Sequence, residues 1–378
     1  MTLTTLTGAP FQRDDGHQQL RESVRRFLNA HSGEDDVRAQ MATESGFDAQ
    51  LWRMLGSQLE LTGLTVPTTY GGSGCSLVEQ TIVLEEMGRR LTCAPYLSTA
   101  VLGVQALLEV DDEELRRRLL PRVASGETRL SVALTEADGE RGSAGSGVTA
   151  TEDPDGFRLD GTRDFVLDGH TADLLITPAT RASGLGLFAV DASAQGLERA
   201  QMPTLDATRR LARVQFRKTP AQLIAATSPE QVLRRLLDVG AIAVAAEQVG
   251  GADEALASSV AFAKHRTQFG AAIGTFQAIK HSCADALVAV ESARSLVAYA
   301  AWAHGNAPDE VPVAAPIAKS FCSEVFTAIA AMNIHLHGAL GFTWEHNAHL
   351  FLKRAKTSEQ LWGNPRHHRR VLAERLGI

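Results

Sequence analysis

The chain has 378 residues, of which 44% are hydrophobic and 21% are charged, as is ordinary for a globular protein. This length allows two or three hydrophobic cores. The formal net charge of -7, without a long basic run, argues against nucleic acid as the main partner.

The sequence carries no targeting or membrane signal that we recognise. Residues Met1 to Pro10 lack the basic start and apolar core of a signal peptide, and the apolar run Val239 to Ala246 is too short to span a bilayer. Four widely spaced cysteines indicate neither a disulfide framework nor a metal cage. We therefore expect a cytoplasmic protein that is not attached to a membrane.

Residues 1–126 are predicted to be helical. Apolar side chains recur at helical spacing from Leu20 to Leu28 and again from Leu77 to Met87. The glycine-rich stretch Pro67 to Gly74 breaks the pattern between two helices.

Residues 127–224 change to a pattern of short strands. The predicted strands are Thr128 to Leu134, Phe157 to Arg163, Ala172 to Ile176 and Leu185 to Val190. Short strands separated by Gly, Asp and Pro favour an antiparallel sheet or a small barrel. A glycine-rich G-x-G-x-x-G turn after a strand is missing from the sequence, which argues against a Rossmann nucleotide site.

Residues 225–378 are again predicted to be helical. One apolar stripe runs along Phe276, Ile279, Cys283, Leu287, Val290, Val297 and Ala301. Its steps of three, four or seven residues are typical of a helix in a bundle.

The stretch His265 to Gly270, followed by Gly274 to Gln277, lies between two long helical patterns. The guanidinium of Arg266 offers donors that can hold a diphosphate, Phe269 can cover a flat ring, and Gln277 can bond an adenine edge. Taken alone, the same residues are also consistent with a helix break that carries an incidental charge.

Together with its neighbours, this stretch resembles the FAD-binding signature R-x-x-F-G-x-x-(I/L)-x-x-F-Q of acyl-CoA dehydrogenases. The segment Gly341 to His346 resembles the actinobacterial subtype of that family. The resemblance implies an α+β fold with an N-terminal helical domain (1–126), a middle antiparallel β domain (127–224) and a C-terminal four-helix bundle (225–378). It also implies that Arg266, Gln268, Phe269 and Gln277 contact FAD.

The resemblance implies α,β-desaturation of an acyl-CoA thioester. In this reaction a carboxylate removes the α-proton and the flavin accepts the β-hydride. The family also leads us to expect an electron-transferring flavoprotein as electron acceptor and a homo- or hetero-oligomer, either dimer or tetramer.

Further flavin contacts follow from the resemblance in the β domain. Leu134 and Thr135 match a strand end that meets the flavin ring in the family, and Phe165 replaces a tryptophan that packs against it. Leu167 replaces a threonine that donates to the flavin, so that this contact is lost. All of them could instead be ordinary strand residues.

The stretch His335 to Phe342 resembles a glycine-rich loop that, in the family, reaches FAD bound mainly by a neighbouring subunit. His335 replaces a glutamine there, whereas Gly338 is retained so that backbone amides can approach a phosphate. His335 and His337 lack a third ligand at a spacing suited to a metal, so we expect no metal site.

The catalytic base is not at either place that the family uses. Those two positions hold Trp362 and Gly240, neither of which takes a proton. Glu247 lies two helical turns after Gly240 among apolar residues and is our candidate base, since an unpaired carboxylate there has a raised pKa. The alternative is a structural ion pair, for example with Arg294.

Several functions remain open on the sequence alone. In one version Glu247 is a relocated base and the protein is a homo-oligomer. In another version a paralogous chain completes the site. The small residues Gly240 and Ala241 leave room for a bulky acyl group. The remaining alternatives are a catalytically silent partner subunit and a different flavoenzyme, such as an oxidase or monooxygenase, on the same fold.

Overall fold

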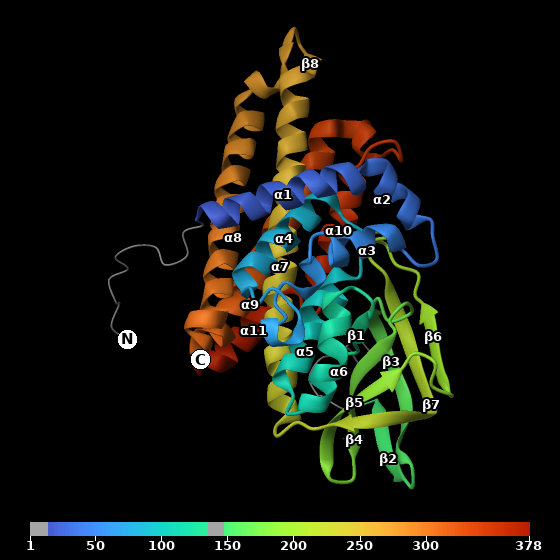
Figure 1. Ribbon diagram of the computed structural model, residues 1–378. Coiled ribbons are helices and arrows are strands. Elements are labelled where there is room, and N and C mark those ends of the chain that lie inside the picture. Colours follow the sequence, from blue (N-terminus) through green and yellow to red (C-terminus); the bar gives the residue numbers. More distant parts are fainter. Residues whose placement is uncertain (1–13, 135–146) are drawn as a thin grey trace.

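The computed structural model describes residues 14–134 and 147–378, in which helices, strands and then helices follow one another along the chain (Figure 1). This order confirms the predicted architecture. The helices and helical turns of the N-terminal domain are α1 (Asp15–His31), α2 (Glu34–Met41), α3 (Ala49–Ser57), η1 (Leu61–Gly63), η2 (Thr68–Tyr70), α4 (Leu77–Arg90), the π-helix η3 (Leu97–Gly103), α5 (Val104–Glu109) and α6 (Glu113–Ala124).

Local sequence sets where these helices begin. The Asp14 side chain accepts the N–H of His17 at the start of α1, and Ser76 and Glu79 form a capping box at the start of α4. Each cap satisfies N–H groups that would otherwise lack a partner at a helix N-terminus. In the predicted glycine-rich break, Gly71 has φ 80°, a conformation that glycine adopts without steric cost.

The β domain consists of β1 (Leu130–Val132), β2 (Val148–Asp153), β3 (Gly156–Leu167), β4 (Leu174–Arg181), β5 (Gly184–Asp191), β6 (Leu197–Gln201) and β7 (Leu211–Ile224). The strand order is β1-β4-β2-β3-β7-β5, and β5 also pairs with β4, so the sheet closes into a barrel. Phe188, Val214 and Phe216 fill its interior.

The expectation of an antiparallel sheet needs one correction. Most pairings are antiparallel, but β1 and β2 each pair with β4 in the parallel direction. Neither strand is joined to β4 by a hairpin, and strands joined through longer crossovers can run parallel. Strands β2, β6 and β7 were not recognised in the sequence.

The C-terminal part contains α7 (Pro229–His265), β8 (Thr267–Gln268), β9 (Ala271–Ala272), η4 (Ile273–Thr275), α8 (Gln277–Asn306), η5 (Pro308–Glu310), α9 (Val311–His337), η6 (Gly338–Phe342), α10 (Ala348–Gln360) and α11 (Pro365–Leu376). Helix α9 packs against α7, α8, α10 and α11. The stretch Pro308–Phe342 is apolar and long enough to cross a bilayer, but its central place among these helices accounts for that composition.

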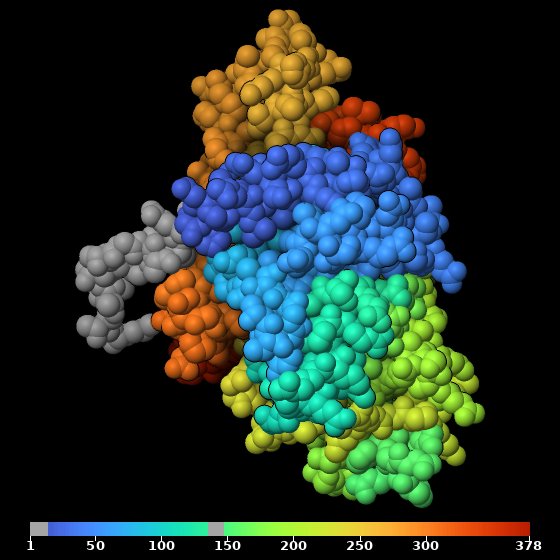
Figure 2. All heavy atoms as spheres, in the orientation of Figure 1, coloured from blue at the N-terminus to red at the C-terminus, as the bar shows by residue number. Residues whose placement is uncertain are grey.

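The ends of α7 and α8 extend past the N-terminal domain and carry the β8–β9 hairpin at their tip (Figures 1 and 2). The predicted apolar stripe on α8 therefore divides into two halves. Val290, Val297 and Ala301 are buried in the bundle, whereas 38% of Phe276 and 52% of Leu287 are exposed. The exposed half has no covering element within the described parts of the chain.

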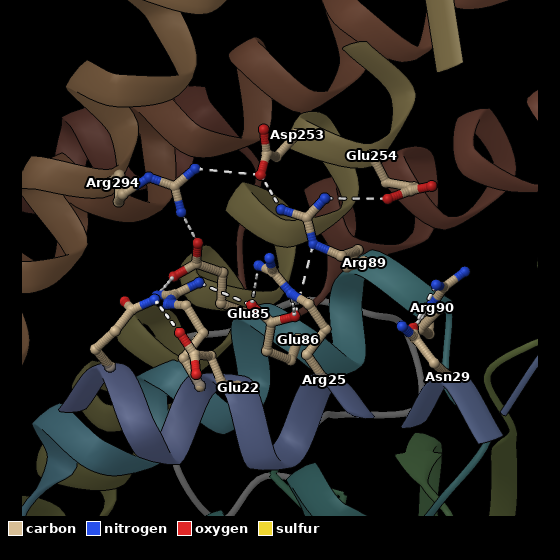
Figure 3. A network of polar contacts seen from close by, with 12 residues as sticks. Glu22, Arg25, Asn29, Glu85, Glu86, Arg89, Arg90, Asp253, Glu254 and Arg294 are labelled. Carbon is tan, nitrogen blue, oxygen red and sulfur yellow. Dashed lines mark hydrogen bonds and ion pairs between the residues drawn. The ribbon is translucent and has the colours of Figure 1, made fainter. Parts of the chain in front are cut away.

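A network of buried charges joins the N-terminal domain to the bundle (Figure 3). Arg21 in α1 donates to Glu85 and Glu86 in α4, over 2.7 and 2.8 Å. Arg294 in α8 pairs with Glu85 and with Asp253 in α7. Opposite charges are thus matched across four helices, as buried carboxylates require.

Candidate functional site

The predicted FAD signature forms the tip of the α7–α8 hairpin. Arg266 ends α7 by donating its backbone N–H to the carbonyl of Phe262, and its own carbonyl accepts the N–H of Ile273 over 2.8 Å. Phe269 and Gly270 form the turn between β8 and β9 with φ values of 53° and 79°, which suit the twist of a two-residue hairpin.

The tip brings together the four signature residues that the sequence predicts. Arg266, Gln268 and Gln277 are exposed, and 94% of Phe269 is exposed. The ring of Phe269 meets that of Phe276 edge to face at 6.4 Å. Within the described residues the side chain of Arg266 makes no ion pair, so that its guanidinium is available to an anion.

The predicted glycine-rich loop lies at the same end of the bundle. Gly338 ends α9 with φ 61° and ψ -138°, a conformation that only glycine adopts readily. The ring of His337, one residue earlier, packs in a tilted arrangement on Phe262 of α7 with the ring centroids 4.2 Å apart, and thereby places the loop beside the last turn of that helix. His335 is exposed, whereas His337 is buried and bonds the Asn333 carbonyl.

The two histidines therefore do not face a common point. Among the residues that the structure describes, no group of three or more His, Cys, Asp or Glu side chains is placed to hold a metal ion.

The β-domain residues predicted to meet the flavin ring lie at neighbouring strand ends. The hydroxyl of Ser131 in β1 donates to the carbonyl of Leu167 in β3 over 2.6 Å, which joins these ends. Phe165 sits in a bulge of β3 with φ 55° and is 39% exposed, and Leu134 is half-buried. Thr135 lies outside the described residues.

The two groups of predicted flavin residues are far apart in one chain. The β8–β9 hairpin lies at one end of the molecule and the β domain toward the other (Figure 1). Leu167, at the end of β3, lines the same small cavity as Glu247 of α7. The rise of 1.5 Å per residue along α7 separates Glu247 from Arg266 by roughly 28 Å. The residues predicted to contact the flavin therefore form two separate groups in one chain.

Glu247 is buried in α7, as the sequence predicts, but it has a partner. Its carboxylate accepts a hydrogen bond from Arg209, in the connection before β7. Arg294, which the sequence suggested as an alternative partner, instead pairs with Glu85, Asp253 and Glu291. The sequence could not single out Arg209 because the two residues come from different domains.

The two positions that hold the base in the family are in contact. A Cβ atom added to Gly240 would lie 2.9 Å from the indole ring of Trp362 and 3.4 Å from Leu102. Trp362 is buried in the loop after α10, and the carbonyl of Gly363 is held by the ammonium of Lys319 over 2.9 Å. The indole thus fills the space beside Gly240, and the expectation of room for an acyl group there is wrong.

Comparison with known proteins agrees with this architecture. The model of the acyl-CoA dehydrogenase N-terminal domain matches residues 14–127, and the model of the acyl-CoA dehydrogenase C-terminal domain matches residues 230–377. The chain is 36% identical over 350 residues to acyl-CoA dehydrogenase IpdE2 of Mycobacterium tuberculosis, covering 92% of this chain and 93% of that protein.

Two solved assemblies are similar in structure. A variant of the Tcur3481-Tcur3483 steroid ACAD matches with a TM-score of 0.87 and 31% identity, over 96% of this chain and 98% of that one. The ChsE4-ChsE5 complex from Mycobacterium tuberculosis matches with a TM-score of 0.89 and 27% identity, over 98% and 99%. The chain therefore belongs to the acyl-CoA dehydrogenase family, flavoprotein oxidoreductases that act on the CH–CH bond of acyl-CoA thioesters.

Proposed function

We propose that the chain binds FAD and desaturates an acyl-CoA thioester between its α and β carbons. The observation that carries this proposal is the exposed tip at which Arg266 has no ion-pair partner among the described residues and Phe269 is 94% exposed. An exposed cation beside exposed aromatic rings fits a diphosphate and a flat heterocycle. Gly338 and the exposed Gln277 add a backbone without a Cβ atom and an amide to the same end of the bundle.

FAD would be held by residues from two chains. Arg266, Gln268, Phe269, Gln277, His335 and Gly338 form one half-site, and Leu134, Thr135 and Phe165 form the other. When bound, the flavin supplies the acceptor for the β-hydride of the thioester. The chain's own residues hold its diphosphate, pack against its ring and exclude water. We further propose an electron-transferring flavoprotein as the acceptor, in keeping with the family.

Two sources of the base remain consistent with the proposal. One source is Glu247, whose carboxylate is buried but already accepts a hydrogen bond from Arg209. In the alternative, a second chain of different sequence supplies the base. The packing of Trp362 on Gly240 favours this mixed oligomer, because the two positions that hold the base in the family are here filled by residues that cannot take a proton. Relatives that are named as acyl-CoA dehydrogenases favour an enzyme over a silent scaffold or an oxidase.

The substrate class is proposed from the comparisons. The steroid ACAD among the similar structures leads us to expect an acyl-CoA with a bulky ring system. We place the reaction in the cytoplasm, since the four cysteines are all free thiols, as a reducing compartment maintains them.

The test is an anaerobic visible spectrum of the purified chain before and after addition of acyl-CoA thioesters, both linear and ring-bearing. Bleaching of a flavin spectrum by a thioester supports a self-sufficient dehydrogenase and identifies the substrate class. Bleaching only after a paralogous chain is co-expressed supports the mixed oligomer. A flavin that reacts with oxygen but with no thioester in either preparation contradicts the proposal.

A further inference from the structure

The loop of residues 338–345, here called the cofactor loop because it begins at Gly338, is closed at its base by two histidine rings. His337 is the last residue of α9, and His346 lies two residues before the start of α10. Their ring centroids are 4.2 Å apart and the ring planes are tilted by 43°. The ring of His337 also packs on Phe262 of α7. The residues on both sides of the loop thus meet beside the end of α7.

Beyond its base, the cofactor loop is held mainly by local contacts. The N–H of Thr343 donates to the carbonyl of Leu340 over 3.1 Å, within the loop itself. Gly341 packs closely on α9, where an added Cβ atom would lie 3.0 Å from the carbonyl of Ile334. Three apolar side chains of the loop are 45%, 73% and 65% exposed, namely Leu340, Phe342 and Trp344. The loop is therefore sensitive to a change at its base.

Hydrogen bonds determine which ring nitrogens carry protons. Nδ1 of His337 lies 2.8 Å from the carbonyl oxygen of Asn333. A carbonyl only accepts, so this nitrogen carries a hydrogen. Nδ1 of His346 lies 3.1 Å from the backbone nitrogen of Ala348, whose N–H donates to it. This nitrogen carries no hydrogen, and the neutral ring of His346 therefore has its proton on Nε2.

A second proton on His346 would disrupt this arrangement. Only Nδ1 is free to take it, and a protonated Nδ1 can no longer accept the N–H of Ala348. Ala348 is the first residue of α10, so its N–H has no acceptor within the helix. The charged ring would also lie beside the ring of His337. Protonation of His346 therefore weakens both contacts at the base of the loop.

The charged side chains of α2 and α10 that face His346 do not form an ion pair with it in the described parts of the chain. Arg38 and Glu34 of α2 pair with each other over 3.3 Å. Arg38 also donates to the side chain of Asn347 over 2.7 Å. His349 of α10 lies nearby. Of these groups, only Glu34 carries a negative charge, and it is shared with Arg38.

A cavity of about 260 Å³ beside His346 brings α4 and α7 to the same place. Arg89 of α4 pairs with Glu254 of α7 over 3.0 Å, and Arg90 donates to Asn29 over 2.8 Å (Figure 3). The remaining charged residue of the lining, Glu345, is exposed to solvent. A protonated His346 would therefore have no buried carboxylate of its own.

The electrostatic surroundings favour the neutral form of His346. Burial lowers the pKa of its ring, and His337 and Arg38 lower it further, whereas Glu34 opposes them. The folded state therefore binds the proton less tightly than the unfolded state, whose pKa is 6.5. The stabilisation by the neutral ring is complete above about pH 6.5 and is lost as the pH falls below that value.

We propose that His346 is a positioning residue for flavin binding. Its neutral ring, held by the N–H of Ala348 and packed on His337, closes the base of the cofactor loop, and its protonation in acid releases the loop. This inference rests on the proposed binding of FAD at Gly338. It concerns the loop that follows α9 and does not depend on the source of the catalytic base.

The test compares the flavin-loaded protein at pH 5.5 and pH 7.5 for wild type, His346→Asn and His304→Asn. The asparagine of His346→Asn offers an oxygen to the N–H of Ala348 and is neutral at both pH values. His304→Asn is the matched control, because His304 is half-buried at the opposite end of α8 from the hairpin tip and burial lowers its pKa too. Flavin affinity and hydrogen–deuterium exchange of residues 338–348 are measured, with exchange corrected for its intrinsic pH dependence.

Wild type and His304→Asn are expected to bind flavin more weakly at pH 5.5 than at pH 7.5. The expected decrease is roughly two- to tenfold, as for the loss of one hydrogen bond. Exchange protection of residues 338–348 should decrease with it. His346→Asn is expected to show the same flavin affinity and the same protection at both pH values.

Three results overturn the proposal. The first is an equal decrease of flavin affinity in wild type and His346→Asn. The second is a loop whose protection in wild type does not change between the two pH values. The third is a failure to fold of both His346→Asn and His346→Ser, because a neutral oxygen acceptor must suit this position. A chain that holds no flavin at either pH contradicts the proposed function instead, while exchange of the loop still tests His346.

Discussion

Arg266 is the residue on which the proposed binding of FAD mainly depends. It is exposed at the tip of the α7–α8 hairpin, beside Phe269, and makes no ion pair among the described residues. Surface arginines are usually of little consequence, but an arginine without a carboxylate partner next to an exposed phenylalanine is typical of a binding surface.

We expect Arg266→Ala to retain less flavin. A charge-assisted hydrogen bond contributes about 1.5–3 kcal/mol, so that flavin affinity decreases by roughly tenfold or more. The ratio of flavin absorbance to protein absorbance after gel filtration measures the effect. Lys264→Ala, on the same exposed end of α7, is the matched control and should retain the wild-type ratio. Equal flavin content in the two variants would remove the central support for the proposed site.

Glu247→Gln separates a catalytic role from a structural one. If Glu247 is the base, kcat decreases by several orders of magnitude while the flavin is retained. A structural role instead leaves turnover per flavin-loaded molecule unchanged and reduces stability, because Arg209 then lacks a charged partner; such losses are about 3–5 kcal/mol. Turnover, flavin content and unfolding are therefore measured together, and full turnover per flavin rules out Glu247 as base.

At the scale of elements, buried ion pairs hold α1 on α4 and α4 on the bundle. Arg21 is buried between Glu85 and Glu86, and burial lowers the pKa of its guanidinium. The packing of helix α1 on α4 is therefore stabilised by matched charges as well as by burial of Val24 and Leu28 in its apolar face.

Arg21→Gln is expected to lower the free energy of unfolding by about 1.5–3 kcal/mol, since it removes charge-assisted hydrogen bonds from two buried carboxylates that each keep another arginine as partner. Arg25→Gln is the control on the same helix. Its side chain pairs with Glu86 but is 42% exposed, so that we expect at most about 1 kcal/mol. Urea unfolding monitored by circular dichroism measures both, and equal losses would contradict the assignment of α1 docking to the buried pair.

At the scale of the whole molecule, the exposed half of α8 indicates a second chain. Leu287 and Val288 are 52% and 67% exposed on a helix end that projects from the rest of the molecule (Figure 2). The hairpin tip and the β-domain strand ends, which we propose to bind one flavin, lie well apart within a chain (Figure 1). A second chain that covers α8 would bring the two half-sites together.

Leu287→Asp is expected to lower both the molar mass in solution and the flavin content, because a charge at an apolar interface must be desolvated. Light scattering after gel filtration measures the mass. Leu376→Asp, a leucine with 50% exposure in the last helix, is the control and should leave both quantities unchanged. An unchanged mass for Leu287→Asp would exclude this face of α8 from the subunit contact.

The sequence by itself determined the helical domains, their order around a β domain, and the tip residues of the hairpin. Those features depend on local signals: apolar periodicity from Leu20 to Leu28, a glycine-rich break, and a compact motif from His265 to Gly270. Only the tertiary structure decided that Glu247 pairs with Arg209 and that Trp362 packs on Gly240. Each pair joins segments far apart in the chain, and neither residue of a pair carries a local signal of its partner. The parallel pairing of β1 with β4 escaped prediction for the same reason, because strand direction depends on crossover connections and not on strand periodicity.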